Sequence, residues 1–278
     1  MGKVLDVTRI YEKLKKELRR ELTKLTQSLR LALIKIGKDY SSQVYLSSQE
    51  KLAKELGIEY VVVELDAKDS EAAAIKKIEE LNNDERITGI MIHKPFPRHW
   101  SEDVIFSALS HKKDVEGISP YNLGMLCLGK PLFISPTVLS VLELLKNIKV
   151  DLYGKDVTIV GFSSIIGKPL TFLLGNNFAT VNITHIATYK VKRLPFYIKN
   201  ADIVISAVGK PHVIKGTWIK KGSIIIDVGT AQRQGKITGD VEFDVAFKKA
   251  SYISPVPGGV GKLTPLFLFK NLLKAAQL

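Results

Sequence analysis

The sequence has little cysteine and no long apolar run. Cys127 is the single cysteine among 278 residues, which excludes an internal disulfide and disfavours a zinc site built on thiolates. No stretch approaches the roughly 20 apolar residues that span a membrane, and Met1 to Arg20 is charged and helix-like rather than signal-like. We therefore expect a cytoplasmic protein with no membrane partner and no metal site, and with Cys127 buried as a small apolar residue.

Acidic residues are also in short supply. The chain has 41 Lys and Arg against 28 Asp and Glu, a net charge of +13, which admits nucleic acid, anionic membranes or anionic small molecules as partners. The basic residues are spread over predicted helices, in "EKLKKELRRELTKL" with acids between them, and this is typical of solvated helix faces. Because neither an aromatic-interleaved RNA platform nor zinc-finger spacing is present, nucleic acid is not favoured as a partner.

Apolar periodicity alternates between helix and strand along the chain. After a predicted helix at 1–24, a small parallel α/β unit is expected, with strands at 29–37, 59–65 and 87–97 and helices at 41–58 and 69–84. A long helix at 133–150 begins at Ser135 and Pro136, which suit a cap and a first turn. Five near-continuous apolar strands follow, at 155–161, 179–187, 201–209, 222–229 and 250–259, and an amphipathic helix covers 262–278.

This pattern predicts a two-domain α/β chain, since buried apolar strands separated by helices indicate a parallel sheet covered on both faces. We expect a first domain at 1–135, with the helix 263–278 packing back on it. A Rossmann-type, doubly wound dinucleotide-binding domain is expected at 136–262.

One turn carries a nucleotide-binding signal. In "IVGFSSIIGKP", Gly161 and Gly167 bracket a strand-to-helix turn, where close backbone approach and the free N–H groups of a helix N-terminus favour phosphate. The middle glycine of GxGxxG is missing, and a glycine at such a turn is also a purely structural choice. The turn opens a doubly wound series, however, which is the context that the motif requires.

Residues further along bear on the choice of cofactor. The second strand of the series ends at "THIATYKVKR" without the acid that holds a ribose 2′-hydroxyl in NAD enzymes, and Lys190, Lys192 and Arg193 follow instead. Positive charge there favours the 2′-phosphate of NADP, although a solvated basic loop has the same composition. Asp227 and Gly229 end a later strand at the carboxyl edge of the sheet, where α/β ligands bind.

Together these motifs resemble the methylenetetrahydrofolate dehydrogenase/cyclohydrolase family through nearly the whole chain. The marks are "SSQVYLSSQEKLAKELGI", "GIMIHKPFP", "KKDVEGISPYNLG", "GKDVTIVGFSSIIGKP", "ADIVISAVGKP", "IIIDVG", "TGDVEFD" and "ISPVPGGVGKLT". The resemblance implies a two-domain subunit with a folate cleft between the domains, usually homodimeric through the nucleotide domain. It also implies oxidation of 5,10-methylenetetrahydrofolate to the methenyl form, commonly followed by hydration to 10-formyltetrahydrofolate.

Carried over residue by residue, the resemblance implies a catalytic set in the first domain. Tyr45 would flank the folate ring, and Gln49 occupies the position at which the family normally has lysine. His93 stands for the glutamine of the family's "VQLPLP" strand end, and Glu116 for the aspartate before glycine in "DVDG". Substrate contacts are implied at Tyr45 and Glu116 and, in "PVPGGVG", at Pro257, Gly258 and Gly259.

For the cofactor, the resemblance implies a larger set of binding residues, and two positions of the cofactor motifs differ from the family's pattern. The arginine of the family's "GRS", which commonly meets the 2′-phosphate, is Phe162, and the serine of "HS" is Ile186. NADP is still predicted, with NAD left possible. The implied cofactor-binding residues are Gly161, Phe162, Ser163, Ile166, Gly167, Lys190, Arg193, Val208, Gly209, Asp227 and Gly229. Asp240 in "TGDV" fits either a site or a structural turn.

The missing lysine affects the two reactions of the family differently. Hydride transfer needs aligned reactants in a water-poor site, which a neutral amide at Gln49 permits. Hydration of the methenyl bridge needs a group that takes and returns a proton, and an amide cannot do this. Lys51 faces away on a helix that turns about 100° per residue, and strand alternation turns Lys94 to the other face, whereas His93 could exchange a proton.

We therefore expect an NADP-dependent methylenetetrahydrofolate dehydrogenase with weak or absent cyclohydrolase activity. Two alternatives stay open. One is a fully bifunctional enzyme in which His93 or water replaces the lysine. The other is a non-catalytic folate- or nucleotide-binding protein, against which Tyr45, Glu116 and the complete "PVPGGVG" argue.

Overall fold

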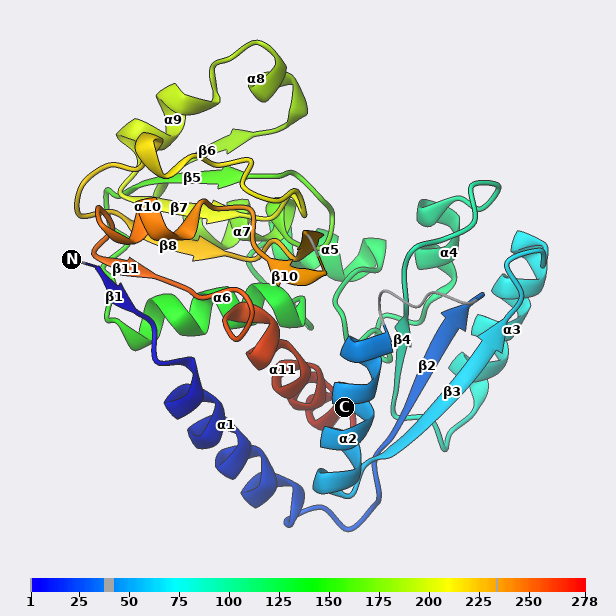
Figure 1. Ribbon diagram of the computed structural model, residues 1–278. Coiled ribbons are helices and arrows are strands. Elements are labelled where there is room, and N and C mark those ends of the chain that lie inside the picture. The colour runs from blue at the N-terminus through cyan, green and yellow to red at the C-terminus, as the bar shows by residue number, and fades with distance from the viewer. Residues whose placement is uncertain (1, 38–42, 234) are drawn as a thin grey trace. The chain divides into compact units, whose positions relative to one another are not determined.

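The computed structural model describes residues 2–37, 43–233 and 235–278; the side chains of residues 43–45 are outside this description. The chain divides into two compact units, which are described separately (Figure 1). Unit 1 comprises Met1–Lys13 and Thr137–Thr264, and unit 2 comprises Leu14–Pro136 and Pro265–Leu278. Two helices contribute residues to both units, α1 (Val7–Leu22) and α11 (Val260–Ala275).

Unit 1 is built on a six-stranded, entirely parallel sheet of order β1-β11-β8-β7-β5-β6. The strands are β1 (Lys3–Val4), β5 (Asp156–Val160), β6 (Thr180–Thr184), β7 (Ile203–Ser206), β8 (Ile224–Asp227) and β11 (Tyr252–Ile253). Strands β5, β7 and β8 are buried along most of their length, as expected for a parallel sheet covered on both faces. The strand order reverses at β5, because β6 lies on one side of it and β7 on the other.

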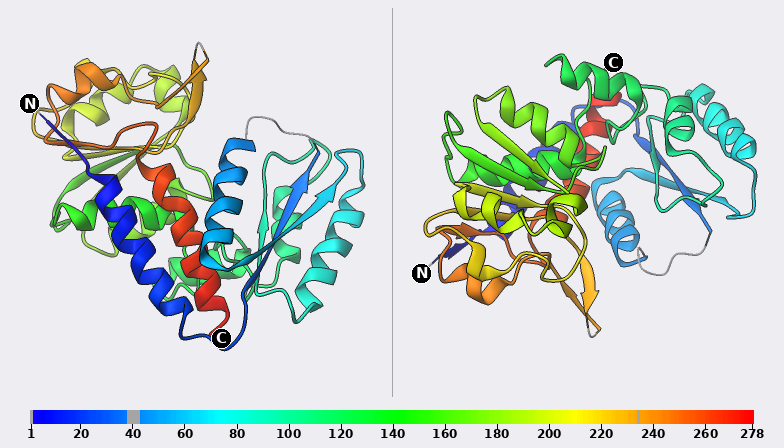
Figure 2. Two further views of the ribbon diagram at one scale, coloured as in Figure 1. Left: turned by 60° about the horizontal axis from the view of Figure 1, so that its bottom comes forward. Right: turned by 90° about the horizontal axis from the view of Figure 1, so that it is seen from above.

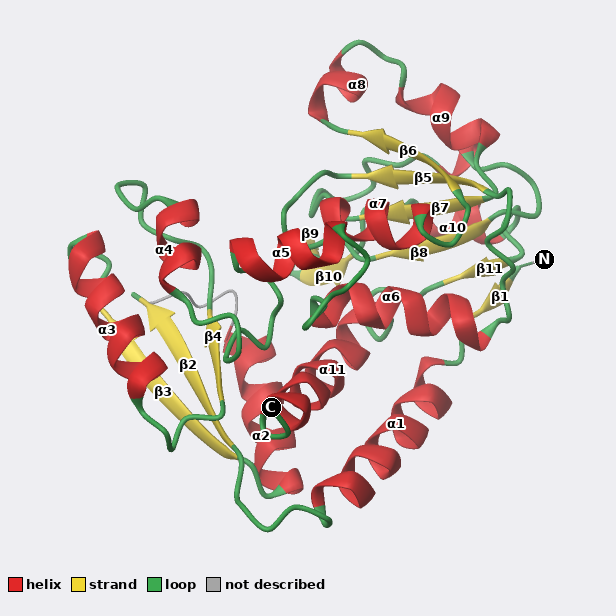
Figure 3. Cartoon of the chain, turned by 180° about the vertical axis from the view of Figure 1, so that it is seen from behind, coloured by secondary structure: helices red, strands yellow, loops and turns green. Residues whose placement is uncertain are grey.

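Helices and one hairpin complete unit 1. They are α6 (Pro136–Asn147), α7 (Gly167–Gly175), α8 (Ile186–Lys190), α9 (Leu194–Asn200), the 3₁₀ helix η1 (Gly216–Trp218), α10 (Phe243–Phe247), and the antiparallel pair β9 (Ala231–Arg233) and β10 (Lys236–Thr238). Right-handed crossovers put α7 and α9 on opposite faces of the sheet, because the chain leaves β5 in one direction and returns from β6 in the other. Figure 3 shows α8 and α9 beside the edge strand β6.

Unit 2 has a three-stranded parallel sheet of order β3-β2-β4, with strands β2 (Arg30–Ile36), β3 (Glu59–Leu65) and β4 (Gly89–Ile92). Its helices are α2 (Gln43–Leu56), α3 (Glu71–Asn83), α4 (Glu102–Ala108) and α5 (Pro120–Cys127). Helices α2 and α3 lie on opposite faces of the sheet (Figure 2). Helix α3 begins after Ser70, whose Oγ accepts a hydrogen bond from Ala73 N at 3.2 Å, as an N-cap serine does.

The two-domain parallel α/β architecture predicted from the sequence is confirmed, with a correction at the N-terminus. Lys3 and Val4 form a strand rather than part of a helix, because they pair with Tyr252 and Ile253. Residues 1–13 therefore belong to unit 1, although the prediction gave 1–135 to the folate domain. The other divisions, at 136/137 and 264/265, compare with predicted boundaries at 135/136 and 262/263.

The prediction of a buried cysteine is wrong. Cys127 is exposed at the end of the short helix α5, next to Leu128, which is also exposed. The apolar run around it belongs to a helix that buries only one side, with Leu126 facing the core. In the part of the chain that the structure describes, no helix combines the length and the apolar character needed to cross a membrane.

Candidate active site

Gln49 lies in the middle of α2 and is completely buried. Its Oε1 accepts a hydrogen bond of 2.9 Å from the hydroxyl of Tyr60, in the neighbouring strand β3. Its Nε2 has no hydrogen-bond partner among the described residues. The Gln49 amide is therefore paired only at its oxygen. A buried amide N–H₂ left unpaired costs about 1–3 kcal/mol.

The other predicted residue of this helix is Tyr45. Its backbone belongs to α2, but its side chain lies outside the described residues, so stacking of Tyr45 on a folate ring stays a prediction. Lys51 is exposed, whereas Gln49 is buried, which agrees with the expectation that these two side chains leave the helix on different sides.

His93 and Glu116 both lie at the carboxyl end of β4. The backbone N–H of His93 donates to Ile34 O at 2.9 Å and so extends the β2–β4 ladder. Ile92 N donates to Glu116 Oε2 at 3.3 Å, and a bridge between Ile90 and Asp114 holds the segment before Glu116 alongside the strand. The structure therefore places these two predicted residues at one end of the same sheet.

The surroundings of the Glu116 carboxyl favour its protonated form. Burial raises the pKa of Glu116 to about 8, and the charge of Asp114 acts in the same direction, against the Ile92 N–H and Lys94. Lys94 itself forms an ion pair with Glu102, with 2.6 Å between Nζ and Oε1. A protonated carboxyl can donate a hydrogen bond and can pass a proton on.

Unit 1 places the predicted nucleotide turn where its strand order reverses. Gly161 follows β5, and Val208 and Gly209 follow β7, its neighbour; ligands of open α/β sheets bind outside the carboxyl ends of strands at such a reversal. Gly161 has φ +120°, and a Cβ there would lie 2.5 Å from Ala207 O. Gly167 packs against the Gly161 carbonyl with no room for a side chain.

The residues between these glycines remain open to solvent. Phe162 and Ser163 are exposed, and Ser163 Oγ accepts from Ile166 N at 3.2 Å, which closes the turn before α7. Lys168, the second residue of α7, holds its Nζ 5.5 Å from the centre of the Phe162 ring. A tight glycine turn, an exposed face and a lysine at a helix start fit a phosphate-bearing dinucleotide.

The predicted basic loop lies beyond β6. Lys190 ends α8 and is exposed, and the Arg193 guanidinium lies 5.6 Å from the centre of the Tyr197 ring. Helix α8 is capped by His185, whose Nδ1 accepts from Ala187 N at 3.3 Å. The loop thus presents positive charge at the carboxyl end of β6, and its role in selecting NADP stays a prediction.

Asp227 supports the loop that follows β8. It is 4% exposed, and its carboxylate accepts from the backbone N–H groups of Gly229, Asp240 and Val241 at 3.0, 3.2 and 2.9 Å. Burial raises the pKa of Asp227 to about 7, with the bond from Val241 opposing and the charge of Asp240 adding to the shift. Gly229 packs against the Asp240 carboxylate with no room for a Cβ.

Asp240 performs the same task for the loop that follows β7. Its buried carboxylate accepts from Ser206 Oγ at 2.6 Å, from Val208 N at 2.7 Å and from Lys210 N at 2.8 Å. These contacts are those of a structural residue, the second of the two roles considered for Asp240. The pair of aspartates fixes the backbone around Val208, Gly209 and Gly229, which are predicted cofactor contacts.

The "PVPGGVG" segment leaves the same edge of the sheet after β11. Ser254 Oγ accepts from Asp227 N at 2.8 Å, and the Val256–Pro257 peptide is cis. Pro257 and Gly258 are exposed and Gly258 has φ +94°, while Gly259 packs too closely on the Pro255 carbonyl to carry a side chain. Exposed backbone of this kind can approach a ligand closely.

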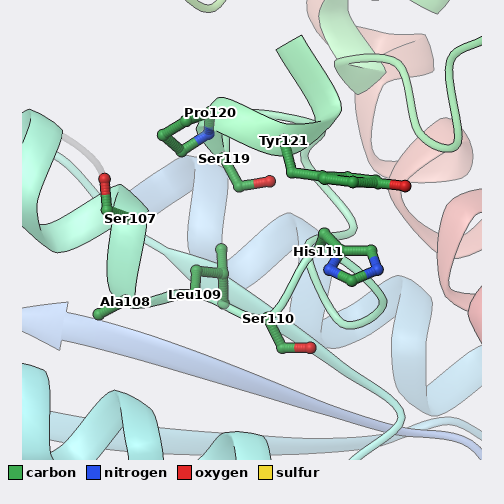
Figure 4. Close-up of a pocket in the computed structure, with 8 residues that line it drawn as sticks. All are labelled: Ser107, Ala108, Leu109, Ser110, His111, Ser119, Pro120 and Tyr121. Atoms are coloured by element: carbon green, nitrogen blue, oxygen red, sulfur yellow. The ribbon is translucent and has the colours of Figure 1, made fainter. Parts of the chain in front are cut away.

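A pocket of about 320 Å³ lies elsewhere in unit 2 (Figure 4). It is lined by Ser107, Ala108, Leu109, Ser110, His111, Ser119, Pro120 and Tyr121. The rings of His111 and Tyr121 lie 4.1 Å apart between centroids and form one wall. None of the predicted site residues lines this pocket. Across the described ranges, no group of three or more His, Cys, Asp or Glu side chains is arranged to hold a metal ion.

Two residues next to predicted site residues were missed from the sequence. The Tyr60 hydroxyl donates a hydrogen bond to Gln49, but nothing in "EYVVVEL" distinguishes this tyrosine from any other tyrosine in a strand. Lys168 contacts Phe162, and its signal was available in the "GKP" at the predicted start of a helix.

The fold and the nucleotide turn define a class of protein: a two-unit α/β chain with a Rossmann-type dinucleotide-binding unit. Family models match both parts of the chain. Residues 5–116 match the catalytic domain of tetrahydrofolate dehydrogenase/cyclohydrolase, and residues 135–278 match the NAD(P)-binding domain of the same family. The chain therefore belongs to the tetrahydrofolate dehydrogenase/cyclohydrolase family of enzymes.

Individual relatives agree over the full length. The bifunctional protein FolD of Geotalea uraniireducens is 42% identical over 281 residues, covering 100% of this chain and 99% of the relative. The solved FolD methylenetetrahydrofolate dehydrogenase/cyclohydrolase of Campylobacter jejuni has a TM-score of 0.94 at 38% identity, covering 100% of this chain and 99% of that one. The FolD of Trypanosoma brucei, solved with NADP cofactor and an inhibitor, has a TM-score of 0.93 at 34% identity, covering 99% and 97%.

Proposed function

We propose that this chain oxidises 5,10-methylenetetrahydrofolate to 5,10-methenyltetrahydrofolate with NADP and hydrolyses the methenyl product weakly or not at all. The observation that carries the second part is Gln49, a buried neutral amide where the family normally has lysine. The first part is supported by membership of the family, by the nucleotide turn of unit 1, and by the relative solved with NADP.

For the oxidation, the chain's task is to bind and align. NADP accepts the hydride when bound. The tight turn at Gly161 and Gly167 fits its phosphates, and Lys168, Lys190 and Arg193 supply positive charge for the 2′-phosphate. Tyr45, Glu116 and the exposed backbone at Pro257 and Gly258 are the proposed folate contacts. None of these tasks needs a proton carrier at position 49.

The hydration step differs because water must lose a proton as it attacks. Gln49 cannot take that proton. The two lysines considered as substitutes are engaged elsewhere, since Lys51 is exposed and Lys94 is paired with Glu102. Loss of the lysine therefore weakens hydration without disturbing oxidation.

A second candidate is a bifunctional enzyme that moves the proton through other groups. The relatives are named as bifunctional proteins. His93 and Glu116 share one strand end, and the Glu116 carboxyl, with a pKa of about 8, can carry a proton near neutral pH. A proton taken from the attacking water and passed between these two side chains would replace the role of the lysine.

A time course with 5,10-methylenetetrahydrofolate and NADP separates the candidates. NADPH and methenyltetrahydrofolate are recorded independently and corrected for spontaneous hydrolysis. We expect the two to rise together, and we expect Gln49→Lys to increase methenyl hydrolysis at least about tenfold with little change in NADPH formation. Methenyl consumption by the natural chain faster than in buffer would establish the bifunctional candidate, and His93→Gln would then be the next variant.

Three further properties belong to the same proposal. NADP is preferred over NAD because the basic residues stand where an NAD enzyme has an acid. The chain forms a homodimer through its nucleotide-binding unit, as the family resemblance implies, and it works in the cytoplasm. Relative affinities for the two cofactors, and sedimentation of the purified chain, test the first two directly.

A further inference from the structure

Ser254 joins the chain that leaves β11 to the end of β8. Its side chain is completely buried, and its Oγ accepts a hydrogen bond from Asp227 N at 2.8 Å and donates one to Asp227 O at 3.4 Å. Its backbone N–H donates to Ile225 O at 2.9 Å and so extends the β11–β8 ladder by one step. The Ser254 hydroxyl therefore anchors the "PVPGG" segment at the point where that segment leaves the sheet.

The "PVPGG" segment packs closely at both of its ends. A Cβ added at Gly259 would lie 3.5 Å from Ser254 Cβ, so the segment folds back onto its own first anchor. A Cβ added at Gly239 would lie 3.0 Å from Cγ2 of Val256, so the Val256 side chain packs against the chain just before Asp240. The segment is thus fixed on β8 through Ser254 and on the loop before Asp240 through Val256.

Asp240 carries this connection to the next strand. Its carboxylate accepts hydrogen bonds from Val208 N at 2.7 Å and from Lys210 N at 2.8 Å, in the loop that follows β7. Strands β11, β8 and β7 are neighbours in the sheet. Contacts between buried groups therefore connect the segments that follow three adjacent strands, from Ser254 to Val208.

This connection joins two sets of proposed ligand contacts. Pro257 and Gly258 are the proposed folate contacts of the "PVPGG" segment, and Val208 and Gly209 are proposed cofactor contacts. Hydride transfer depends on how precisely the two reactants are aligned. We propose that Ser254 is a positioning residue, whose hydroxyl holds the folate-contacting segment in register with the cofactor-contacting loop and thereby supports hydride transfer. This inference rests on the proposed function.

Three variants separate this role from general stability. Ser254→Ala removes both hydrogen bonds to Asp227 and adds no bulk. Val256→Ala shortens the side chain that packs on Gly239 and leaves the serine in place. Ser251→Ala is the matched control, because the Ser251 hydroxyl donates to Ser223 O at 3.2 Å at the other end of β11.

The measurement is the rate of the first turnover, read as NADPH fluorescence after the full chain loaded with NADP is mixed with saturating 5,10-methylenetetrahydrofolate. We expect this rate to fall about 10-fold in Ser254→Ala and about 3-fold in Val256→Ala. The KM for the folate and the Kd for NADPH should stay within about 3-fold of the natural values, since the contacts themselves remain. Ser251→Ala should react at the natural rate.

A structural role alone gives a different result. Ser254→Ala would then melt at a lower temperature, while its folded form would complete the first turnover at the natural rate, and this outcome would overturn the proposal. An equal loss of rate in Ser251→Ala would overturn it as well. If Ser254→Ala does not fold, Val256→Ala decides, and a natural first-turnover rate in that variant counts against the proposal. Absence of NADPH formation by the natural chain would instead reject the proposed function.

Discussion

Single residues in unit 2 decide where a proton can be held. A lysine at position 49 would carry one on its ammonium group, and Gln49 does not. The Glu116 carboxyl holds one instead, because burial and the neighbouring Asp114 raise its pKa to about 8. Proton-carrying capacity is thus present at the carboxyl end of β4, next to His93, rather than on α2.

The raised pKa of Glu116 predicts how stability depends on pH. The shift is upward from an ordinary value of 4.5, so the folded state binds the proton more tightly than the unfolded chain does. The contribution of Glu116 is then fully present below pH of about 4.5 and is lost as the pH rises towards about 8. Glu116→Gln stays neutral throughout and removes this loss.

We expect Glu116→Gln to melt several degrees above the natural chain at pH of about 8.5, corresponding to on the order of 2 kcal/mol, and close to it at pH of about 5. Thermal unfolding followed by circular dichroism across this range measures the difference. Glu79→Gln, at an exposed position of α3, is the control and should show no such trend. A difference between Glu116→Gln and the natural chain that is constant with pH would contradict the assignment.

At this scale the sequence identified positions better than contacts. Gln49, His93 and Glu116 were found because a motif resemblance fixes positions along the chain, and the structure places His93 and Glu116 at one strand end. The bond from Tyr60 to Gln49 could not be predicted, because it depends on how α2 packs over the register of β3. Whether these residues act on folate stays a prediction.

Among the elements, the loops after β7 and β8 are fixed by two buried aspartates rather than by regular structure. Asp240 binds the backbone of Val208 and Lys210, and Asp227 binds the segment that contains Asp240. Both oxygens of each carboxylate accept hydrogen bonds. In an asparagine, an N–H₂ group would replace one of these oxygens and would face another hydrogen-bond donor. The proposed cofactor contacts at Val208, Gly209 and Gly229 depend on this arrangement.

Asp240→Asn should therefore weaken cofactor binding through the loop. We expect a loss of about 1–3 kcal/mol in unfolding free energy and an increase in the Kd for NADP of about 5-fold or more, with a smaller change in the KM for the folate substrate. Chemical denaturation and fluorescence titration with NADPH measure the two effects. Asp244→Asn, at an exposed position of α10, is the matched control. An equal effect in both variants would show that the loop after β7 does not account for the weaker binding of NADP.

Elements with a strong periodic signal were predicted and those defined by distant pairing were not. Helix α3 has a serine cap and α6 begins at Pro136, and both were expected near their observed limits. Strand β1 has two residues and exists because β11 lies beside it. The hairpin β9–β10 was also missed, since its strands are three residues each and mostly exposed.

For the whole molecule, the net charge of +13 is the property that no single element explains. Many of the basic residues are exposed and lie on several helices, among them Lys13, Lys16 and Arg20 of α1. A long-range positive potential raises the encounter rate of anions, and its effect falls as salt shortens the Debye length from about 20 Å to about 7 Å. A folate with additional glutamates carries more negative charge and should feel this potential more strongly.

We expect kcat/KM for the triglutamate form of 5,10-methylenetetrahydrofolate to fall several-fold between ionic strengths of about 0.02 M and 0.2 M, and to fall less for the monoglutamate. The kcat should change little for either substrate, because steering acts before the bound complex forms. Initial rates of NADPH formation, with NADP kept saturating at each salt concentration, isolate the folate dependence. If the two substrates lose activity in parallel, the charge contributes to solubility rather than to capture of the substrate. If only the triglutamate responds, the excess of lysine and arginine is part of how this enzyme collects a polyanionic folate.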